Sequence, residues 1–174
     1  MSKPIEILVQ ETLDKLADPK LECAADVKDF YRTWMDAVWN YQCPSMLFDF
    51  YTKDIHVYRE NGDDCVGIFA VVKEVAAIQA AFPDMKIRVA SMVVNGDPEN
   101  GYQVWARTYF NGTNLGYSKY GPPTGKKLEG DLCMNLDMLK LEQIGGKWQV
   151  VQESLMRSAR ILREVMGGPH NIKV

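Results

Sequence analysis

Histidine and closely spaced cysteine are both scarce in this sequence, and their scarcity excludes the commoner metal sites. Two histidines occur in 174 residues, and one of them, His170, lies in the C-terminal tail. The four cysteines, Cys23, Cys43, Cys65 and Cys133, are too far apart to form a zinc motif. We therefore expect free thiols in a cytoplasmic protein, with no metal and no cofactor.

Basic clusters and long apolar runs are also missing. The 20 basic and 23 acidic residues are scattered, for a net charge of −3, so we expect no nucleic-acid partner. No apolar run approaches the ~20 residues of a membrane span. The first residues, MSKPIEILVQETLDKL, carry charges in place of the apolar core of a signal peptide. We expect a protein with no membrane partner.

The hydrophobic pattern changes its period along the chain. In the first half apolar residues mostly recur at helical spacing, whereas after Pro83 they alternate with period two. The pattern predicts helices over 4–17, 25–42, 45–52, 67–81 and 155–166, and strands over 54–60, 85–95, 102–111, 127–142 and 148–154. This order indicates an α+β fold, with helices packed on one face of a curved, largely antiparallel sheet.

The stretch GDLCMNLDMLKLE, residues 130–142, is the most informative of these strands. Its two sides carry different residues: Leu132, Met134, Leu136 and Met138 on one, and Asp131, Cys133, Asn135 and Asp137 on the other. Short polar groups mixed with apolar ones suit the wall of a pocket. The pattern alone favours the alternative, in which the polar side is the solvated face of an ordinary sheet.

The loop GTNLGYSKYGPPTGKKLEG, residues 112–130, resembles that of the SnoaL-like polyketide cyclase family. Phe82-Pro83-Asp84 before a strand and the Gly-Gly-Lys-Trp turn also fit this family, which is part of the nuclear-transport-factor-2-like superfamily. The resemblance implies a cone-shaped α+β barrel with an internal pocket. It divides the chain into an N-terminal helical extension (1–24), a cone domain (25–156) and a C-terminal helix and tail (157–174).

The resemblance also implies functional residues. Asp137 matches the acid that donates to the substrate oxyanion in ketosteroid-isomerase-like members, and Arg107 matches an arginine of epoxide-hydrolase-like members. Together with Tyr109, they form the expected catalytic set. The other expected pocket residues are Tyr31, Trp34, Val38, Arg59, Trp105, Cys133, Asn135, Gln152 and Ser154. His56 is expected to face outward.

Three acids of known family members are replaced in this chain. Arg59 stands where ketosteroid isomerases have a general base, and Tyr109 stands where epoxide hydrolases have an aspartate. Met156 stands where SnoaL cyclases have an acid–base aspartate. Asp137 itself has two interpretations: a carboxyl on an apolar wall, with a raised pKa, or the ion-pair partner of Arg107, with a lowered pKa.

Two functional hypotheses follow. The first is a cofactor-independent enzyme performing acid–base chemistry (cyclisation, isomerisation or dehydration) on a carbonyl or polyketide-like substrate. The alternative is a non-catalytic domain that binds a small ligand or acts as a dimeric adaptor. In both, we expect a homodimer through the convex sheet face, where Val104, Ala106, Thr108 and Phe110 would join the Met134 side. The 112–125 loop is expected to lie at the pocket mouth and to be mobile.

Overall fold

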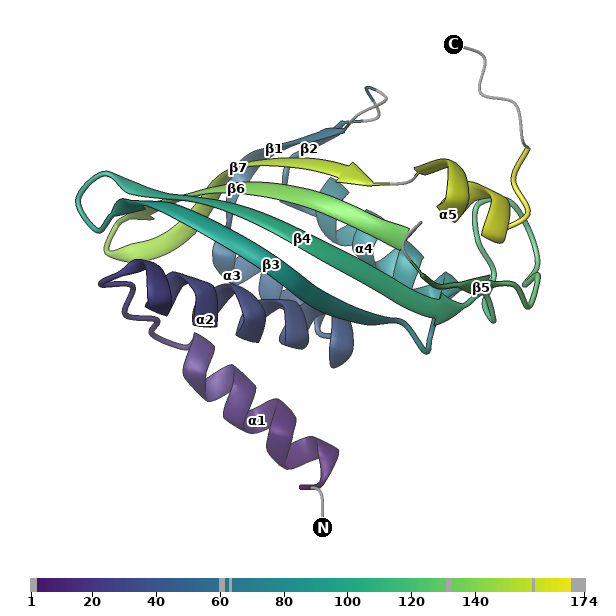
Figure 1. Ribbon diagram of the computed structural model, residues 1–174, viewed down its shortest axis with the longest axis horizontal. Helices are drawn as coiled ribbons and strands as arrows, with labels where there is room; N and C mark the ends of the chain where they lie inside the picture. The colour runs from purple at the N-terminus through teal and green to yellow at the C-terminus, as the bar shows by residue number, and fades with distance from the viewer. Residues whose placement is uncertain (1–2, 60–61, 63, 131–132, 158, 170–174) are drawn as a thin grey trace.

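The computed structural model describes residues 3–59, 62, 64–130, 133–157 and 159–169, and its helices occupy mainly the first half of the chain (Figure 1). They are α1 (Ile5–Leu16), α2 (Ala24–Met35), the π-helical turn η1 (Asp36–Asn40), the 3₁₀ turn η2 (Pro44–Met46), α3 (Leu47–Phe50), α4 (Ile68–Ala81) and α5 (Ala159–Val165). None of the helices in the described residues is long and apolar enough to cross a membrane.

The strands form one curved sheet within the described residues. They are β1 (Tyr51–Arg59), β2 (Cys65–Val66), β3 (Lys86–Asp97), β4 (Gly101–Thr113), β5 (Lys127–Leu128), β6 (Met134–Ile144) and β7 (Lys147–Arg157). Their order is β2-β1-β7-β6-β4-β3, with β5 paired to β4. Strands β1 and β7 run parallel and the other pairs antiparallel. The sheet does not close on itself, and the predicted α+β fold is confirmed.

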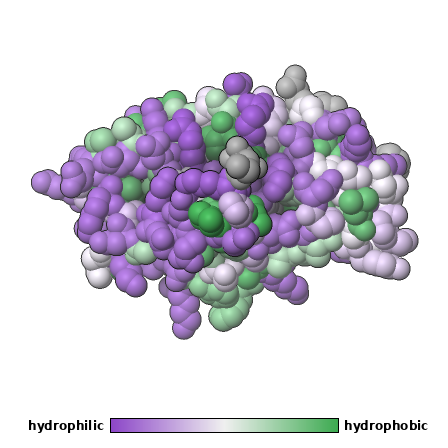
Figure 2. All heavy atoms as spheres, turned by 90° about the horizontal axis from the view of Figure 1, so that it is seen from below, coloured by the Kyte–Doolittle hydropathy of each residue, from purple (hydrophilic) through white to green (hydrophobic). Residues whose placement is uncertain are grey.

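Helices α2, α3 and α4 cover one face of the sheet, which we call the inner face; the opposite, convex face is the outer face (Figure 1). An aromatic cluster fills the space between helices and sheet. The Trp34 ring packs 5.5 Å from Tyr51 and 6.5 Å from Phe50, and Phe50 packs edge-on against Phe30. Such edge-to-face contacts add to the burial of large apolar surfaces. Figure 2, seen from the side of α1 and α2, shows a mainly hydrophilic surface with small hydrophobic areas.

Helix α2 begins at a capping box and ends in the π turn. The Asp26 carboxylate accepts hydrogen bonds from the backbone N–H groups of Glu22 and Cys23, which would otherwise be unpaired at the helix start. The sequence predicts one helix over 25–42, but the last turn is π-helical. Asn40 ends this turn and bonds both backbone groups of Ile87 on β3. The π turn thus fixes the helix end against the sheet.

Several elements differ from prediction. The helix expected over 45–52 ends at Phe50, and β1 begins at Tyr51 instead of residue 54. The expected strand over 127–142 is divided into β5 and β6, and Leu132, expected on its apolar side, lies outside the described residues together with Asp131. Strand β7 continues to Arg157, whereas a helix was predicted from residue 155. Leu155 pairs with β1 on one side and β6 on the other, so two ladders of hydrogen bonds override the local helical pattern. The short strand β2 was not predicted.

Pairing register determines which side chains of β4 and β6 share a face. Residues directly opposite each other in an antiparallel pair point to the same side. Ala106 lies opposite Asp137, whereas Arg107 lies opposite Leu136. The outer face therefore carries Met134, Leu136 and Met138 together with Trp105, Arg107 and Tyr109. The prediction that Val104, Ala106, Thr108 and Phe110 join this face is wrong, since all four are buried on the inner side.

A bulge in β7 changes which of its residues face inward. Lys140 pairs with Gln152 but Leu141 pairs with Val150, so Val151 is an extra residue without a partner on β6. Before the bulge, Trp148 and Val150 are buried; after it, the inward residues are Glu153, Leu155 and Arg157. The bulge therefore places Glu153, an acid not singled out from the sequence, on the inner face.

The loop between β4 and β5 is organised by one fully buried asparagine. The Asn114 amide donates to the carbonyls of Ala81 and Gly116 and accepts from the backbone and hydroxyl of Thr124. The Thr124 hydroxyl also donates to the Val165 carbonyl, which ties the Pro-Pro-Thr-Gly segment to α5. None of the residues that line the pocket described below comes from this loop. The mobility of this loop stays a prediction. Because the hydrogen bonds of Asn114 and Thr124 hold the neighbouring parts of the loop, we expect mobility only around Tyr117.

Candidate active site

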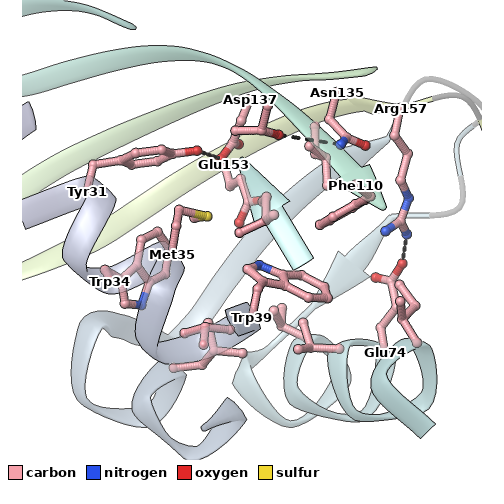
Figure 3. A pocket seen from close by; sticks show the side chains of 18 of the residues that line it. Tyr31, Trp34, Met35, Trp39, Glu74, Phe110, Asn135, Asp137, Glu153 and Arg157 are labelled. Carbon is pink, nitrogen blue, oxygen red and sulfur yellow. Dashed lines mark hydrogen bonds and ion pairs between the residues drawn. The ribbon is translucent and has the colours of Figure 1, made fainter. Parts of the chain in front are cut away.

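A narrow cavity of about 50 Å³ lies between α2, η1, α4 and the inner face of the sheet (Figure 3). The helices supply mostly apolar side chains, including Trp34, Met35, Val38 and Trp39. The sheet supplies most of the polar ones: Arg59, Thr108, Asn135, Asp137, Glu153 and Arg157. The π turn places the neighbouring residues Val38 and Trp39 on the same wall. Such turns occur frequently at functional sites.

Asp137 is buried at the centre of the polar wall. Tyr31 on α2 donates a 2.7 Å hydrogen bond to its Oδ2, as the close view shows (Figure 3). Its other oxygen, Oδ1, is also buried and has no hydrogen-bond partner among the described residues. Burial, and next the charge of Glu153, raise the pKa of Asp137 well above its usual value, although Tyr31 and Arg59 act in the opposite direction. This carboxyl is therefore prepared to hold a proton and to present it at Oδ1.

Glu153 is the second buried carboxyl. It lies on β7 opposite Leu139 of β6, and Asp137 lies opposite Leu155 of β7. The two acids are therefore on adjacent strands, two residues apart along the sheet. The Tyr51 hydroxyl donates a 2.5 Å hydrogen bond to its Oε2. Burial raises the pKa of Glu153, while the Arg59 charge and the Tyr51 hydrogen bond lower it. Because Arg59 is the first group to oppose burial at Glu153, we assign the ionised form to Glu153 and the proton to Asp137.

An ion-pair cluster forms one end of the cavity. Glu74 on α4 pairs with Arg59 on β1 at 2.5 Å and also with Arg157 on β7, a pair visible in Figure 3. The Cys65 thiol approaches the same carboxylate at 3.0 Å. The Arg59 side chain is 7% exposed, and its Nε and Nη1 atoms are buried without a hydrogen-bond partner among the described residues. The indole nitrogen of Trp34 is likewise unpaired.

Half of the expected site residues do lie at the cavity: Tyr31, Trp34, Val38, Arg59, Asn135 and Asp137. Cys133 is buried but is not among the lining residues; its thiol donates to the Glu129 carbonyl. The solvated-face interpretation is wrong for Asn135 and Asp137, which are 3% and 6% exposed. Asn135 contacts the Thr108 hydroxyl at 3.4 Å.

Five other expected residues lie on the outer face. Trp105, Arg107 and Tyr109 point away from the cavity because β4 pairs with β6 in the register given above. Arg107 therefore cannot form an ion pair with Asp137 across the cavity, and it stacks near Tyr109 instead, at 6.0 Å from the ring centroid. Gln152 and Ser154 lie opposite Lys140 and Met138, also on the outer face, because the bulge shifts the alternation.

Sequence reasoning missed Glu153, Glu74, Tyr51 and Arg157. Only the first had a local signal, since Glu153 is the one charged residue of the predicted strand over 148–154. A strict alternation from Trp148 places it outside, and no local feature of the sequence marks the extra residue at Val151. Nothing in the sequence distinguishes Glu74 from the other polar residues of the predicted helices. His56, expected to face outward, contacts Asp64 at 2.9 Å on the partly exposed side of β1.

Solved structures of the same shape place the fold in one class. Nuclear transport factor 2 of Cryptosporidium parvum matches with a TM-score of 0.53 and 12% identity, over 74% of this chain and 89% of that chain. A protein of Jannaschia sp. CCS1 described as a SnoaL-like polyketide cyclase matches with a TM-score of 0.57 and 17% identity, over 97% and 99%. AclR of Streptomyces galilaeus, described as a hydroxylase, matches with a TM-score of 0.56 and 24% identity, over 80% and 84%. These similarities define a nuclear-transport-factor-2-like cone.

The sequence comparison gives the family within this class. The SnoaL-like polyketide cyclase family matches residues 29–158. The chain therefore belongs to that family, and the predicted resemblance is confirmed. No curated protein matches the chain significantly.

Proposed function

We propose that this protein is a cofactor-independent enzyme that enolises a small carbonyl substrate, the step common to isomerisation, cyclisation and dehydration. Asp137, protonated, donates from Oδ1 to the substrate carbonyl oxygen. Glu153, ionised, removes the proton from the adjacent carbon. The C–H electron pair becomes the C=C bond of the enol, and the carbonyl π pair moves to the oxygen that Asp137 protonates.

One observation carries this proposal: two buried carboxyls on neighbouring strands line the same cavity, and one oxygen of the first has no partner within the described part of the chain. Before the step the pair holds one proton and one negative charge, and after it the pair holds the same. A low-dielectric pocket therefore never has to contain a second negative charge, which would be costly. Reversal with the proton returned to a different atom gives isomerisation.

The cavity volume limits the substrate. About 50 Å³ is less than the roughly 150 Å³ of an engineered cavity that binds benzene, and corresponds to a few water positions. Even a short carbonyl compound therefore requires some movement of the lining side chains. A substrate with several rings requires Met35 or another flexible side chain to move aside.

A binding domain without catalysis is the second candidate, and the small cavity is the observation that favours it. Both candidates predict occupancy of the pocket, but only the enzyme predicts proton exchange. The two are separated by following deuterium incorporation beside the ketone of 4-oxopentanamide by NMR. We expect exchange above the buffer rate, reduced about 10²–10⁴-fold in Asp137→Asn and in Glu153→Gln.

Arg107→Gln provides the matched control, since this charged residue lies on the opposite face of the same sheet. Its exchange rate should equal that of the unmodified protein. An unmodified protein that does not exceed the buffer rate would contradict the enzyme proposal and leave the binding domain.

We also propose a homodimer formed through the outer face. Val93, Trp105, Leu136 and Met156 lie on this face, each more than two-fifths exposed. A contiguous apolar surface on a sheet commonly marks an interface between proteins.

A further inference from the structure

We infer that Thr108 and Asn135 bind a hydroxyl group of the substrate, so that the ligand of the cavity is a hydroxy ketone. The ketone end of this ligand rests on the proposed function. The hydroxyl end rests on the contacts of Thr108 and Asn135, two cavity residues that the proposed reaction does not use.

The first observation is a buried amide with few hydrogen bonds. The Asn135 amide nitrogen contacts the Thr108 hydroxyl at 3.4 Å and the Cys133 carbonyl at 3.5 Å, and both contacts are longer than the roughly 3 Å of an ordinary N–H···O bond. The Asn135 amide oxygen has no hydrogen-bond partner among the described residues. Burial of an amide in this condition is costly unless a ligand or water completes its hydrogen bonds.

The second observation is the matching donor on the neighbouring strand. Thr108 on β4 lies directly opposite Asn135 and is also buried. Its hydroxyl oxygen accepts the contact from Asn135, and its O–H donates to no other described residue. The pair therefore presents one unused acceptor, the amide oxygen, and one unused donor, the threonine O–H.

A hydroxyl group is the small neutral group that fits this pair, because its single oxygen both donates and accepts. A carbonyl oxygen in the same place would leave the Asn135 amide oxygen unpaired. An ammonium group would leave the Thr108 O–H unpaired. Each mismatch keeps a buried polar group without a partner, which weakens binding.

The position of the pair determines where the hydroxyl lies relative to the reacting atoms. Asn135 and Asp137 are two residues apart on β6, both on the inner face (Figure 3), so their Cα atoms are about 7 Å apart. Glu153 lies opposite Leu139, two residues further along β6 on the side away from Asn135. The order along the sheet is therefore hydroxyl, ketone oxygen, reacting carbon. The hydroxyl orients the ketone, and the carbon that loses a proton is on the far side of the carbonyl.

Two probes with the same number of heavy atoms test this inference: 4-hydroxybutan-2-one and pentan-2-one. An NMR titration of the protein should show the hydroxy ketone binding roughly tenfold more tightly or better, since pentan-2-one leaves both polar groups unpaired. The double variant Thr108→Val with Asn135→Leu replaces both partners by apolar groups of similar shape, a change that stability tolerates well. It should lose the preference. Gln103→Leu, at an exposed residue of the outer face of β4, should keep it.

Equal affinity of the unmodified protein for the two probes overturns the inference, and so does the absence of binding or an undiminished preference in the double variant. Where deuterium exchange occurs, it should concentrate at the methyl carbon of 4-hydroxybutan-2-one; exchange mainly at carbon 3 would place the hydroxyl wrongly and overturn the inference too. The proposed function fails separately, through exchange of 4-oxopentanamide. Preference for the hydroxy ketone without any exchange would support the inference and contradict the enzyme.

Discussion

The Tyr31 hydroxyl and the Asp137 carboxylate, 106 positions apart in the chain, meet in a buried 2.7 Å hydrogen bond. The bond joins helix α2 to strand β6 and occupies one oxygen of Asp137, which leaves the other directed at the cavity. A structural contact between a helix and the sheet thus also determines which oxygen of the acid is available to a substrate.

Removing this hydroxyl should change the titration of Asp137. In Tyr31→Phe the ring keeps its packing on Trp34, 6.0 Å away, but the hydrogen bond that lowers the Asp137 pKa is lost. That pKa should rise further, so the protonated acid should persist to higher pH. We expect the pH profile of deuterium exchange to move upward and the free energy of unfolding to fall by about 1 kcal/mol. Tyr109→Phe, on the outer face, should leave the profile unchanged; a profile unmoved in Tyr31→Phe would contradict the proton-donor role.

Stability should depend on pH in the direction set by the two raised carboxyl pKa values. Burial raises the pKa of Asp137 and of Glu153 in the folded protein. The folded state therefore binds these protons more tightly than the unfolded chain does. Their contribution to stability is fully present below the unfolded pKa and is lost as pH rises through the folded values.

Asp137→Asn removes the Asp137 part of this loss. Relative to the unmodified protein, the variant should gain melting temperature progressively as the pH rises above the ordinary carboxyl pKa. Asp97→Asn is the control of opposite sign, because hydrogen bonds from Asn100 lower the Asp97 pKa, so that its removal costs stability above the ordinary carboxyl pKa. A difference in melting temperature between Asp137→Asn and the unmodified protein that is constant with pH would show that Asp137 does not titrate abnormally.

The outer face should mediate dimerisation. Leu136→Lys places a charge at the middle of this face, between Arg107 on β4 and Met156 on β7. We expect sedimentation velocity to show a dimer for the unmodified protein at micromolar concentration and a folded monomer for the variant. Ile7→Lys introduces the same charge at an exposed apolar residue of α1 and should remain dimeric. An unmodified protein that is already monomeric would exclude this interface.

The buried Asn114 should be more important for stability than its position in a loop suggests. Asn114→Ala removes donors to two carbonyls and an acceptor for Thr124, and should cost on the order of 3 kcal/mol in urea unfolding. Hydrogen exchange should show α5 opening more often, because Thr124 also holds the Val165 carbonyl. Asn111→Ala, at an exposed residue of β4, should have a small effect. Equal stability of both variants would contradict the anchoring role.

The fold was predictable from sequence because its signals are local. Helical spacing of apolar residues in the first half predicted the helical layer, and their alternation in the second half predicted the sheet. Most predicted elements occur, with shifted boundaries. The pocket position of Asp137 followed from the family resemblance, because the composition of its strand side alone favoured a solvated face. Helix α5 was misplaced because strand pairing of Leu155 on both sides outweighs the helical pattern of the same residues.

The facing of β4 was not predictable, because both of its sides are compatible with burial. One side carries Val104, Ala106 and Phe110, and the other carries Trp105 and Tyr109 around Arg107. Only the register, which sets Ala106 against Asp137, decides between them. Placing Asp137 and Arg107 in the same pocket therefore required a pairing that the two strands do not make.

The unpaired Val151 makes the chemistry of the pocket depend on where strand β7 changes length as well as on residue identity. Without this residue Gln152 would follow Val150 directly, opposite the consecutive residues Lys140 and Leu141, and Glu153 and Arg157 would still face inward. A one-residue deletion after Glu153, for example of Ser154, would instead turn Leu155 and Arg157 outward. Lineages of this fold can therefore lose a codon at the bulge and keep the charged pocket, whereas a codon lost further along β7 changes the charge of the pocket without any substitution.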